Sequence, residues 1–199
     1  NTAIDTQIKI LVIAEHNESE LNDSVFKVIS AAKSWNGEVD LLVMGKNTEH
    51  VAQKAAKIKD VSSVIRLDGD HLEHLLAEDA AKIVEMLSNN YQVILAAHSW
   101  FSRNFLPRVA AVLNVSLITD VLKIESNNVY TRSIYAGNVH AKIQSKDPIQ
   151  LLTIHTSLFE ACARDGGDAE IISKDTPQAV NMTSWKSEKI NKSDRPALI

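Results

Sequence analysis

The chain has 199 residues, a formal net charge of −4, and globular proportions of apolar (45%) and charged (23%) residues. This mild acidity disfavours nucleic acid as a partner, because nucleic-acid binding needs clustered Lys and Arg. No apolar run approaches the roughly 20 residues that span a bilayer, so membrane insertion is not expected either.

Cysteine and glycine are both scarce. The single cysteine, Cys162, excludes an internal disulfide and indicates an intracellular protein. Residues 1–7 are polar and lack the basic-then-apolar pattern of a signal peptide. With only six glycines, the chain is not expected to contain a glycine-rich phosphate cradle.

The first part of the chain alternates between short apolar runs and longer segments with helical periodicity. The runs predict strands buried on both faces, at residues 8–14, 39–44, 63–67 and 93–97. The periodic segments predict helices at residues 22–35, 48–58, 75–87 and 102–113. This alternation favours a parallel sheet with helices on both faces.

Local signals mark the ends of these helices. Asn22 or Ser24 can cap the first helix, and Asn36-Gly37 can end it. Ser102 is a candidate cap for the fourth helix. That cap would place Pro107 in or near the first turn, where the missing N–H of proline costs little.

The pattern changes after the fourth helix. Strand-like segments follow at residues 117–124, 129–135, 139–144 and 150–155, and Asn127-Asn128 is a plausible hairpin turn. Consecutive strands without intervening helices pair antiparallel, so we expect an antiparallel extension of the parallel core. Beyond Phe159 we expect a turn or mobile loop at Arg164–Asp168 and an extended arm at residues 175–194.

Several histidines invite chemical interpretations. His71 and His74 could share a helix face, but a zinc site needs further ligands, and a solvated polar turn is favoured. His98-Ser99 follows the fourth predicted strand, where open α/β sheets collect ligands. Because no G-x-S-x-G elbow is present, a structural loop is favoured over a Ser/His hydrolase.

Two other turns follow predicted strands. Glu15-His16 could touch a ligand or simply cap a helix, and the second interpretation is favoured. Met44–Asn47 is the nearest thing to a phosphate-binding turn, but its single glycine is more typical of an ordinary loop. Cys162 has no evident activating cation beyond Arg164, so we predict a passive thiol. No residue is predicted to be catalytic, cofactor-binding or metal-ligating.

The segment Arg103–Arg108 is more unusual. It combines two arginines with Phe105, an aromatic residue that we expect to be exposed, at a helix start beyond a strand. Function often lies on such loops. The pattern leaves two alternatives open, which are a contact with a partner and a cluster that caps the helix.

At this segment the chain resembles the N-terminal domain of electron transfer flavoprotein alpha subunits. The resemblance rests on residues 10–16 (ILVIAEH), 37–45 (GEVDLLVMG), 104–111 (NFLPRVAA), 118–121 (ITDV) and 132–138 (RSIYAGN). Residues 193–198 (SDRPAL) look like the junction to a second domain. The resemblance implies a three-layer, mostly parallel, nucleotide-binding-like α/β fold, similar to the adenine nucleotide alpha hydrolases, with an antiparallel strand extension.

The resemblance also implies a function. Such subunits pair with a beta subunit in an FAD-containing carrier, which takes electrons from acyl-CoA and other flavin dehydrogenases and passes them to a quinone oxidoreductase. FAD is then expected mostly outside this chain, in a C-terminal domain, and the chain itself is expected to be a non-catalytic scaffold. The implied location is the bacterial cytoplasm or the mitochondrial matrix.

The organisation implied by the resemblance has three parts. Residues 1–7 are a polar tail, residues 8–174 form the α/β domain, and residues 175–199 form an arm and linker toward a missing FAD-binding domain. Our candidates for the partner interface are Arg132, Tyr135 and Asn138.

The chain departs from the family pattern at two places. The family often has Arg where His155 stands, and the loss of a guanidinium removes a bidentate hydrogen-bonding fork. The loop at residues 97–102 (AHSWFS) adds His98 and Trp100 where small residues are expected. The alternative function is a stand-alone adenine-nucleotide-binding domain, against which the missing glycines count.

Overall fold

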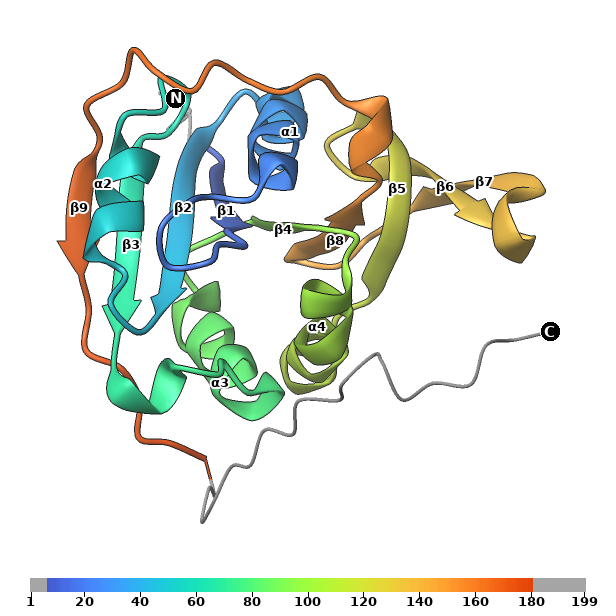
Figure 1. Cartoon of the computed structure of the whole chain (residues 1–199). Helices are drawn as coiled ribbons and strands as arrows, with labels where there is room; N and C mark the ends of the chain where they lie inside the picture. The colour runs from blue at the N-terminus through green and yellow to red at the C-terminus, as the bar shows by residue number, and fades with distance from the viewer. Residues whose placement is uncertain (1–6, 181–199) are drawn as a thin grey trace, which may run out of the picture.

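A nine-stranded mixed sheet forms the centre of the computed structural model, which describes residues 7–180 (Figure 1). The strand order is β7-β6-β5-β8-β4-β1-β2-β3-β9. The strands are β1 (Lys9–Ile13), β2 (Glu38–Gly45), β3 (Ser63–Asp68), β4 (Val93–Ala97), β5 (Leu117–Ser126), β6 (Val129–Ile134), β7 (Val139–Gln144), β8 (Gln150–Ile154) and β9 (Glu170–Ser173).

Helices cover both faces of this sheet. The helices are α1 (Asp23–Ala32), α2 (Glu49–Ala56), α3 (Ala77–Ser88) and α4 (Trp100–Leu113), with short 3-10 turns η1 (Lys33–Trp35), η2 (Asp70–Leu72), η3 (Tyr135–Gly137) and η4 (Thr156–Leu158). Helices α1 and α2 pack on one face, and α3 and α4 pack on the other (Figure 1). In the part of the chain that the structure describes, no helix combines the length and apolar character needed to cross a membrane.

Strand β1 shows why the core strands are continuously apolar. Ile10 and Val12 belong to the core under α1 and α2, whereas Leu11 and Ile13 belong to the core under α3 and α4. All four side chains are buried. Because successive side chains of a strand point to opposite faces, a strand covered on both sides must be apolar at every position. The predicted three-layer, mostly parallel fold is confirmed.

The predicted turn signals are confirmed at two places. Asn36 ends the first helical segment in the left-handed region, with a φ of 51°. Gly37 follows because a Cβ there would lie 2.2 Å from the carbonyl oxygen of Ile8. Asn127 and Asn128 form the turn between β5 and β6, which pair antiparallel.

The antiparallel extension is smaller than expected. Strands β5, β6 and β7 pair antiparallel in order, but β8 returns between β4 and β5 and pairs parallel with both. Four of its five residues are wholly buried, so burial in the centre of the sheet outweighs pairing with the preceding strand. Strands β6 and β7 therefore project from the body of the molecule (Figure 1).

The segment after η4 bends at residues 164–165, which fits the first of the two alternatives for Arg164–Asp168, a turn or a mobile loop. It passes over helices α1 and α2 to the far edge of the sheet, where β9 pairs parallel with β3 (Figure 1). The backbone N–H of Gly167 donates to the carbonyl of Lys57 at 2.8 Å, and that of Ala169 donates to Ala56 at 2.9 Å. A Cβ on Gly167 would lie 2.4 Å from the carbonyl oxygen of Ile58, so glycine permits this close approach.

Helix α4 begins earlier than expected. Its cap is Ser99, and the backbone N–H of Ser102 donates to the Ser99 hydroxyl at 3.2 Å. Pro107 therefore lies inside the helix instead of in its first turn. At the other end of the described chain, the backbone N–H of Val180 donates to the Asp79 carboxylate at 2.9 Å. The rest of the predicted arm and the junction at residues 193–198 lie outside the described residues.

Candidate functional site at the carboxyl edge of the sheet

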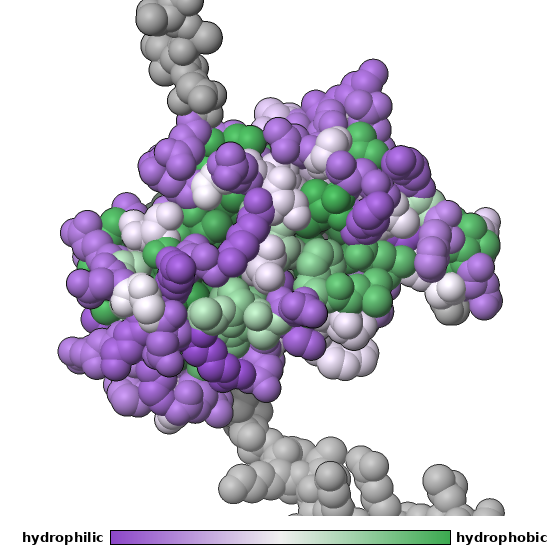
Figure 2. Space-filling model, turned by 90° about the horizontal axis from the view of Figure 1, so that it is seen from above, coloured by the Kyte–Doolittle hydropathy of each residue, from purple (hydrophilic) through white to green (hydrophobic). Residues whose placement is uncertain are grey.

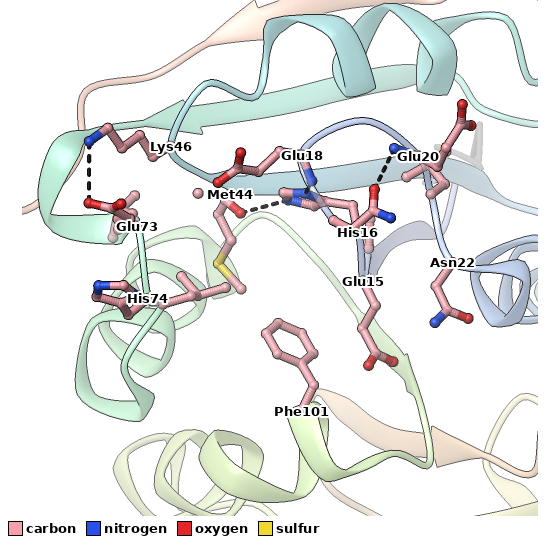
Figure 3. Close-up of a pocket in the computed structure, with 16 residues that line it drawn as sticks. Glu15, His16, Glu18, Glu20, Asn22, Met44, Lys46, Glu73, His74 and Phe101 are labelled. Atoms are coloured by element: carbon pink, nitrogen blue, oxygen red, sulfur yellow. Dashed lines mark hydrogen bonds and ion pairs between the residues drawn. The ribbon is translucent and has the colours of Figure 1, made fainter. Parts of the chain in front are cut away.

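The first cleft lies beyond the ends of β1 and β2, and Phe101 of α4 closes it on the side where the strand order reverses, between β1 and β4. This position is where open α/β sheets usually bind ligands. We call it the switch-point cleft. It has a volume of about 530 Å³, and its lining includes Glu15, His16, Met44, Lys46, Glu73 and Phe101. Figure 3 shows the Glu15 carboxylate and the Phe101 ring on one side of the cavity, with Lys46 and Glu73 on the other.

The switch-point cleft is acidic. Four carboxylates line it, those of Glu15, Glu18, Glu20 and Glu73. The opposing Lys46 ammonium already lies 3.2 Å from Glu73. Burial raises the pKa of Glu15, while a hydrogen bond with Ser99 opposes that rise. Like charges at this density repel a phosphate group, so the cleft does not favour the adenine-nucleotide alternative.

His16 is held between two backbone groups. Its Nε2 lies 2.8 Å from the carbonyl oxygen of Met44, and the backbone N–H of Glu18 donates to its Nδ1 at 3.1 Å. These partners require a neutral ring with its hydrogen on Nε2. Burial lowers the pKa of His16, although the hydrogen bond to Met44 and the charge of Glu18 act against that lowering. His16 thus fixes the turn after β1 but does not cap a helix as expected, because the cap of α1 is Asn22.

The Met44–Asn47 turn holds a carboxylate from the chain itself. The backbone N–H groups of Asn47 and Thr48 donate to the Asp68 carboxylate at 3.2 and 2.7 Å. Arg66 Nη2 donates to the same carboxylate at 2.7 Å. Asp68 therefore occupies two backbone N–H groups that directly precede α2. This internal pairing supports the interpretation as an ordinary loop.

The His98-Ser99 pair is also used structurally. Ser99 caps α4 through its hydroxyl, as described above, and His98 Nδ1 lies 2.9 Å from the Thr153 hydroxyl. No contact between the two side chains makes a nucleophile–base pair. The geometry supports the structural-loop interpretation and gives no support to a Ser/His hydrolase.

A bulge in β5 builds a second polar centre. Ile118 and Val121 of β5 pair with Leu152 and Ile154 of β8. Two residues therefore lie between the paired positions in β5, but only one lies between them in β8. The additional residue is Asp120, with a φ of 56°. Such a bulge re-aims a side chain.

The bulge directs Asp120 toward the end of β8. Its backbone N–H donates to the Thr153 hydroxyl at 2.9 Å, and its carboxylate lies 2.6 Å from His155 Nδ1. His155 thus makes one hydrogen-bonding contact with Asp120, whereas an arginine guanidinium at this position could make two parallel hydrogen bonds with the carboxylate. Sequence reasoning missed Asp120, although it stands inside the recognised ITDV segment.

The second cleft lies beside this bulge, and we call it the hairpin cleft. It has a volume of about 630 Å³ and lies between the ends of β4 and β8, the β5 bulge and the end of β6. Its charged or titratable lining residues are His98, Arg103, Asp120, Arg132, Tyr135 and His155. The cleft therefore brings together Arg132 and Tyr135, two of the three predicted interface residues.

The three predicted interface residues differ in exposure. Arg132 is half-buried, and its Nη2 donates to the Thr119 hydroxyl at 2.9 Å. Tyr135 is 77% exposed and adopts a φ of 50°, which is uncommon for a bulky residue. Asn138 is exposed, and its backbone N–H closes η3 on the carbonyl of Tyr135. Their role at an interface stays a prediction.

The Arg103–Arg108 segment is arranged differently from the expectation. Phe105 is only 1% exposed, and the exposed aromatic is Trp100, at 85%. The Arg103 guanidinium lies 5.1 Å from the centre of the Trp100 ring. Arg108 pairs with Glu78 at 3.0 Å. The side of α4 that faces the core follows the helical spacing of its buried apolar residues, which are Phe105, Leu106, Val109 and Ala110.

The remaining candidates do not form a site. Cys162 is buried, and this burial raises the pKa of its thiol, as a passive cysteine requires. His71 lies in η2 and His74 follows it, so they do not share an α-helix. Within the described residues, no group of three or more His, Cys, Asp or Glu side chains is arranged to hold a metal.

The turns of residues 7–180 at the switch point do not fit a flavin dinucleotide. A dinucleotide diphosphate needs free N–H groups at a helix start. At the switch point, the start of α1 is capped by Asn22, whose side chain accepts from the backbone N–H of Ser24 at 3.0 Å, and the start of α4 is capped by Ser99. No step of a reaction is therefore assigned to a cofactor held by these turns.

The fold and the clefts together define a class, an open α/β domain with polar clefts at its carboxyl edge and a projecting hairpin. The electron transfer flavoprotein domain family matches residues 10–179, and the chain belongs to that family. This match confirms the resemblance found in the sequence.

The chain is similar to several curated alpha subunits. It is 38% identical to electron transfer flavoprotein subunit alpha of Pseudomonas aeruginosa over 189 residues, which cover 95% of this chain and 61% of that protein. It is 36% identical over 193 residues to a probable mitochondrial alpha subunit of Caenorhabditis elegans, covering 94% and 57%. It is 34% identical over 204 residues to the mitochondrial alpha subunit of Dictyostelium discoideum, covering 94% and 58%. The chain thus spans about three fifths of the length of these relatives.

Proposed function

We propose that the chain acts as the N-terminal part of an electron transfer flavoprotein alpha subunit, where it is a scaffold and not a catalyst. The observation that carries this proposal is the similarity to curated alpha subunits across 94 to 95% of the chain. In this proposal, residues 8–174 are the scaffold domain, and residues 175–199 lead toward an FAD-binding domain.

FAD supplies the redox chemistry of the proposed carrier, because a flavin can accept electrons and pass them on. We place it mainly in parts of the alpha subunit that this chain does not include. Two observations support that placement. The relatives are longer than the chain, and the helix starts at its switch point are capped by Asn22 and Ser99. The chain's own contribution is a rigid sheet that holds neighbouring domains in position.

The proposed electron donors are acyl-CoA and other flavin dehydrogenases, and the proposed acceptor is a quinone oxidoreductase. These assignments place the protein in fatty acid β-oxidation. The proposed location is the bacterial cytoplasm or the mitochondrial matrix. The support is the family membership, together with the mitochondrial designation of two relatives.

We assign the contact with the beta subunit to the β6–β7 hairpin. Figure 2 shows a lobe projecting on the right, where β6 and β7 lie in Figure 1, with hydrophobic residues between the lobe and the body. The hairpin exposes Tyr135 and Val139, which are large hydrophobic residues. Tyr135 also keeps a left-handed backbone conformation that Gly or Asn would adopt at lower cost. Arg132 and Asn138 flank it and are the polar members of the proposed surface.

A binding experiment tests this proposal. The chain is mixed with a beta subunit of the family, and complex formation is measured by size-exclusion chromatography and calorimetry. We expect co-elution, and Tyr135→Ala should weaken association by about tenfold or more, as expected when a central aromatic contact is removed. Val112→Ala is the matched control, because Val112 is also exposed but lies on α4. Separate elution of the two proteins, or equal effects of both variants, would contradict the proposal.

A further inference from the structure

The hairpin cleft gathers positively charged and hydrogen-donating side chains from four separate elements. Arg103 comes from α4, Arg132 from β6, His98 from the end of β4 and His155 from the end of β8. One carboxylate, that of Asp120, faces them. We propose that this cleft binds the phosphate group of inorganic phosphate or of a small phosphate ester.

Arg132 supplies the main donor set. Its Nε is buried and has no hydrogen-bond partner among the described residues, while its Nη2 donates to the Thr119 hydroxyl at 2.9 Å. Nε and Nη2 form the side of a guanidinium that binds an oxyanion through two parallel hydrogen bonds. A phosphate whose oxygen replaces the Thr119 hydroxyl would accept from both groups. This exchange would satisfy a buried donor that otherwise costs free energy.

His98 adds a second donor. The Thr153 hydroxyl accepts the backbone N–H of Asp120, and its own hydrogen is then available for His98 Nδ1, 2.9 Å away. Thr153 is wholly buried, so water does not take that hydrogen. This arrangement places the hydrogen of a neutral His98 ring on Nε2, the nitrogen left free to donate to a ligand in the cleft.

The remaining groups set the charge of the cleft. The Asp120 carboxylate would repel phosphate, but His155 Nδ1 lies 2.6 Å from one of its oxygens and can donate a hydrogen bond to it. Arg103 lies at the rim against the Trp100 ring and adds a permanent positive charge. Two arginines therefore oppose one carboxylate before either histidine is counted.

The contrast with the switch-point cleft gives the proposal its specificity. Four carboxylates and one paired lysine line that cleft, so its local charge is opposite to that of the hairpin cleft. An anion approaching the carboxyl edge is repelled at one cleft and attracted at the other. The hairpin cleft, at about 630 Å³, also has room for a phosphate that carries a small substituent.

The test titrates the chain with inorganic phosphate at constant ionic strength, using sodium chloride as the balancing salt. Calorimetry measures affinity, and NMR follows the Nε–H resonances of the arginines. We expect saturable binding that shifts the Arg132 resonance, and Arg132→Gln should weaken it by about tenfold or more. Arg164→Gln is the matched control, because Arg164 pairs with Asp23 away from this cleft. No saturable response at tens of millimolar phosphate, or equal loss in both variants, would overturn the proposal.

A second variant separates binding from folding. Asp120→Asn removes the repelling charge, while the new amide oxygen can still accept from His155 and asparagine tolerates the positive φ. It should tighten phosphate binding several-fold, a gain that a damaged fold does not produce. Unchanged or weaker binding would count against the site. Parallel titrations with adenosine monophosphate and glycerol phosphate distinguish a phosphate ester from inorganic phosphate as the ligand. Tighter binding of an ester identifies a site for phosphate esters. Tighter binding of inorganic phosphate identifies a site for the free anion.

Discussion

The Asp68 carboxylate accepts hydrogen bonds from both the backbone N–H and the hydroxyl of Thr48, at 2.7 and 2.8 Å. It thereby joins the end of β3 to the start of α2. Burial alone would raise the pKa of Asp68, but the hydrogen bonds from Thr48, Arg66 and Asn47 outweigh burial and lower it. The carboxylate is thus an internal anion that supports the fold.

Replacing this anion should destabilise the protein in a pH-dependent way. Asp68→Asn should lower the free energy of unfolding by about 1–2 kcal/mol at neutral pH, because charge-assisted hydrogen bonds are lost. Since the folded-state pKa is lowered, the wild-type advantage is full above the unfolded pKa of about 3.9 and fades as pH falls through the folded value. Urea unfolding at several pH values measures this difference. Asp165→Asn, at an exposed position, is the control, and a pH-independent difference would contradict the argument.

His16 should show one tautomer and resist protonation. NMR of its ring nitrogens should find hydrogen on Nε2 and none on Nδ1, because Met44 and Glu18 fix these roles. Since burial lowers its pKa, His16 should titrate below about 6.5, the unfolded value. Its contribution to stability is full above that pH and is lost as pH falls through the lowered folded value. The same ring in urea-unfolded protein is the reference, and coincident titration curves would refute the prediction.

Pro107 should be replaceable with a gain in stability. It lies inside α4 and is exposed, and its missing N–H leaves the carbonyl of Arg103 without its intrahelical partner. Pro107→Ala should raise the free energy of unfolding by about 1–3 kcal/mol. Val112→Ala, at another exposed position of α4, should change it by less than about 0.5 kcal/mol. A loss of stability in Pro107→Ala would show instead that the proline ring is needed.

Gly167 should tolerate no side chain. A Cβ there would lie 2.4 Å from the carbonyl oxygen of Ile58, whereas at Gly137 the nearest atom would be 3.8 Å away. Gly137 has a φ of 91°, so Gly137→Ala has a backbone cost of about 1–2 kcal/mol without a clash. Gly167→Ala should therefore be the more destabilising variant in urea unfolding. This variant should also speed amide hydrogen exchange in β9. If Gly137→Ala were the more destabilising variant, the close packing of Gly167 against Ile58 would be contradicted.

The parallel core could be predicted because continuously apolar segments indicate strands that are buried on both faces. The position of β8 could not be predicted, because an apolar sequence indicates a buried strand but not the strands with which it pairs. Strand β9 was missed because its four residues are mostly exposed and pair only through a long-range contact. Pro107 was misplaced because Ser99 and Ser102 are both suitable caps, and the structure uses them together.

The candidate site was predictable only in part. Arg132 and Tyr135 stand in a recognisable segment, and both line the hairpin cleft. The contact between Asp120 and His155 depends on one additional residue in β5, and strand periodicity carries no signal for such a bulge. The acidic character of the switch-point cleft likewise arises only when the turn after β1 approaches η2.

The insertion of β8 between β4 and β5 has a consequence for synthesis on the ribosome. Strand β4 is complete at Ala97, but its outer partner begins only at Gln150. While the intervening residues emerge, the apolar edge of β4 has no strand beside it, and β5 has no place in the sheet. Such delayed long-range pairing slows folding and exposes strand edges to other chains. A nascent chain arrested before β8 should therefore be the species that most needs chaperone protection.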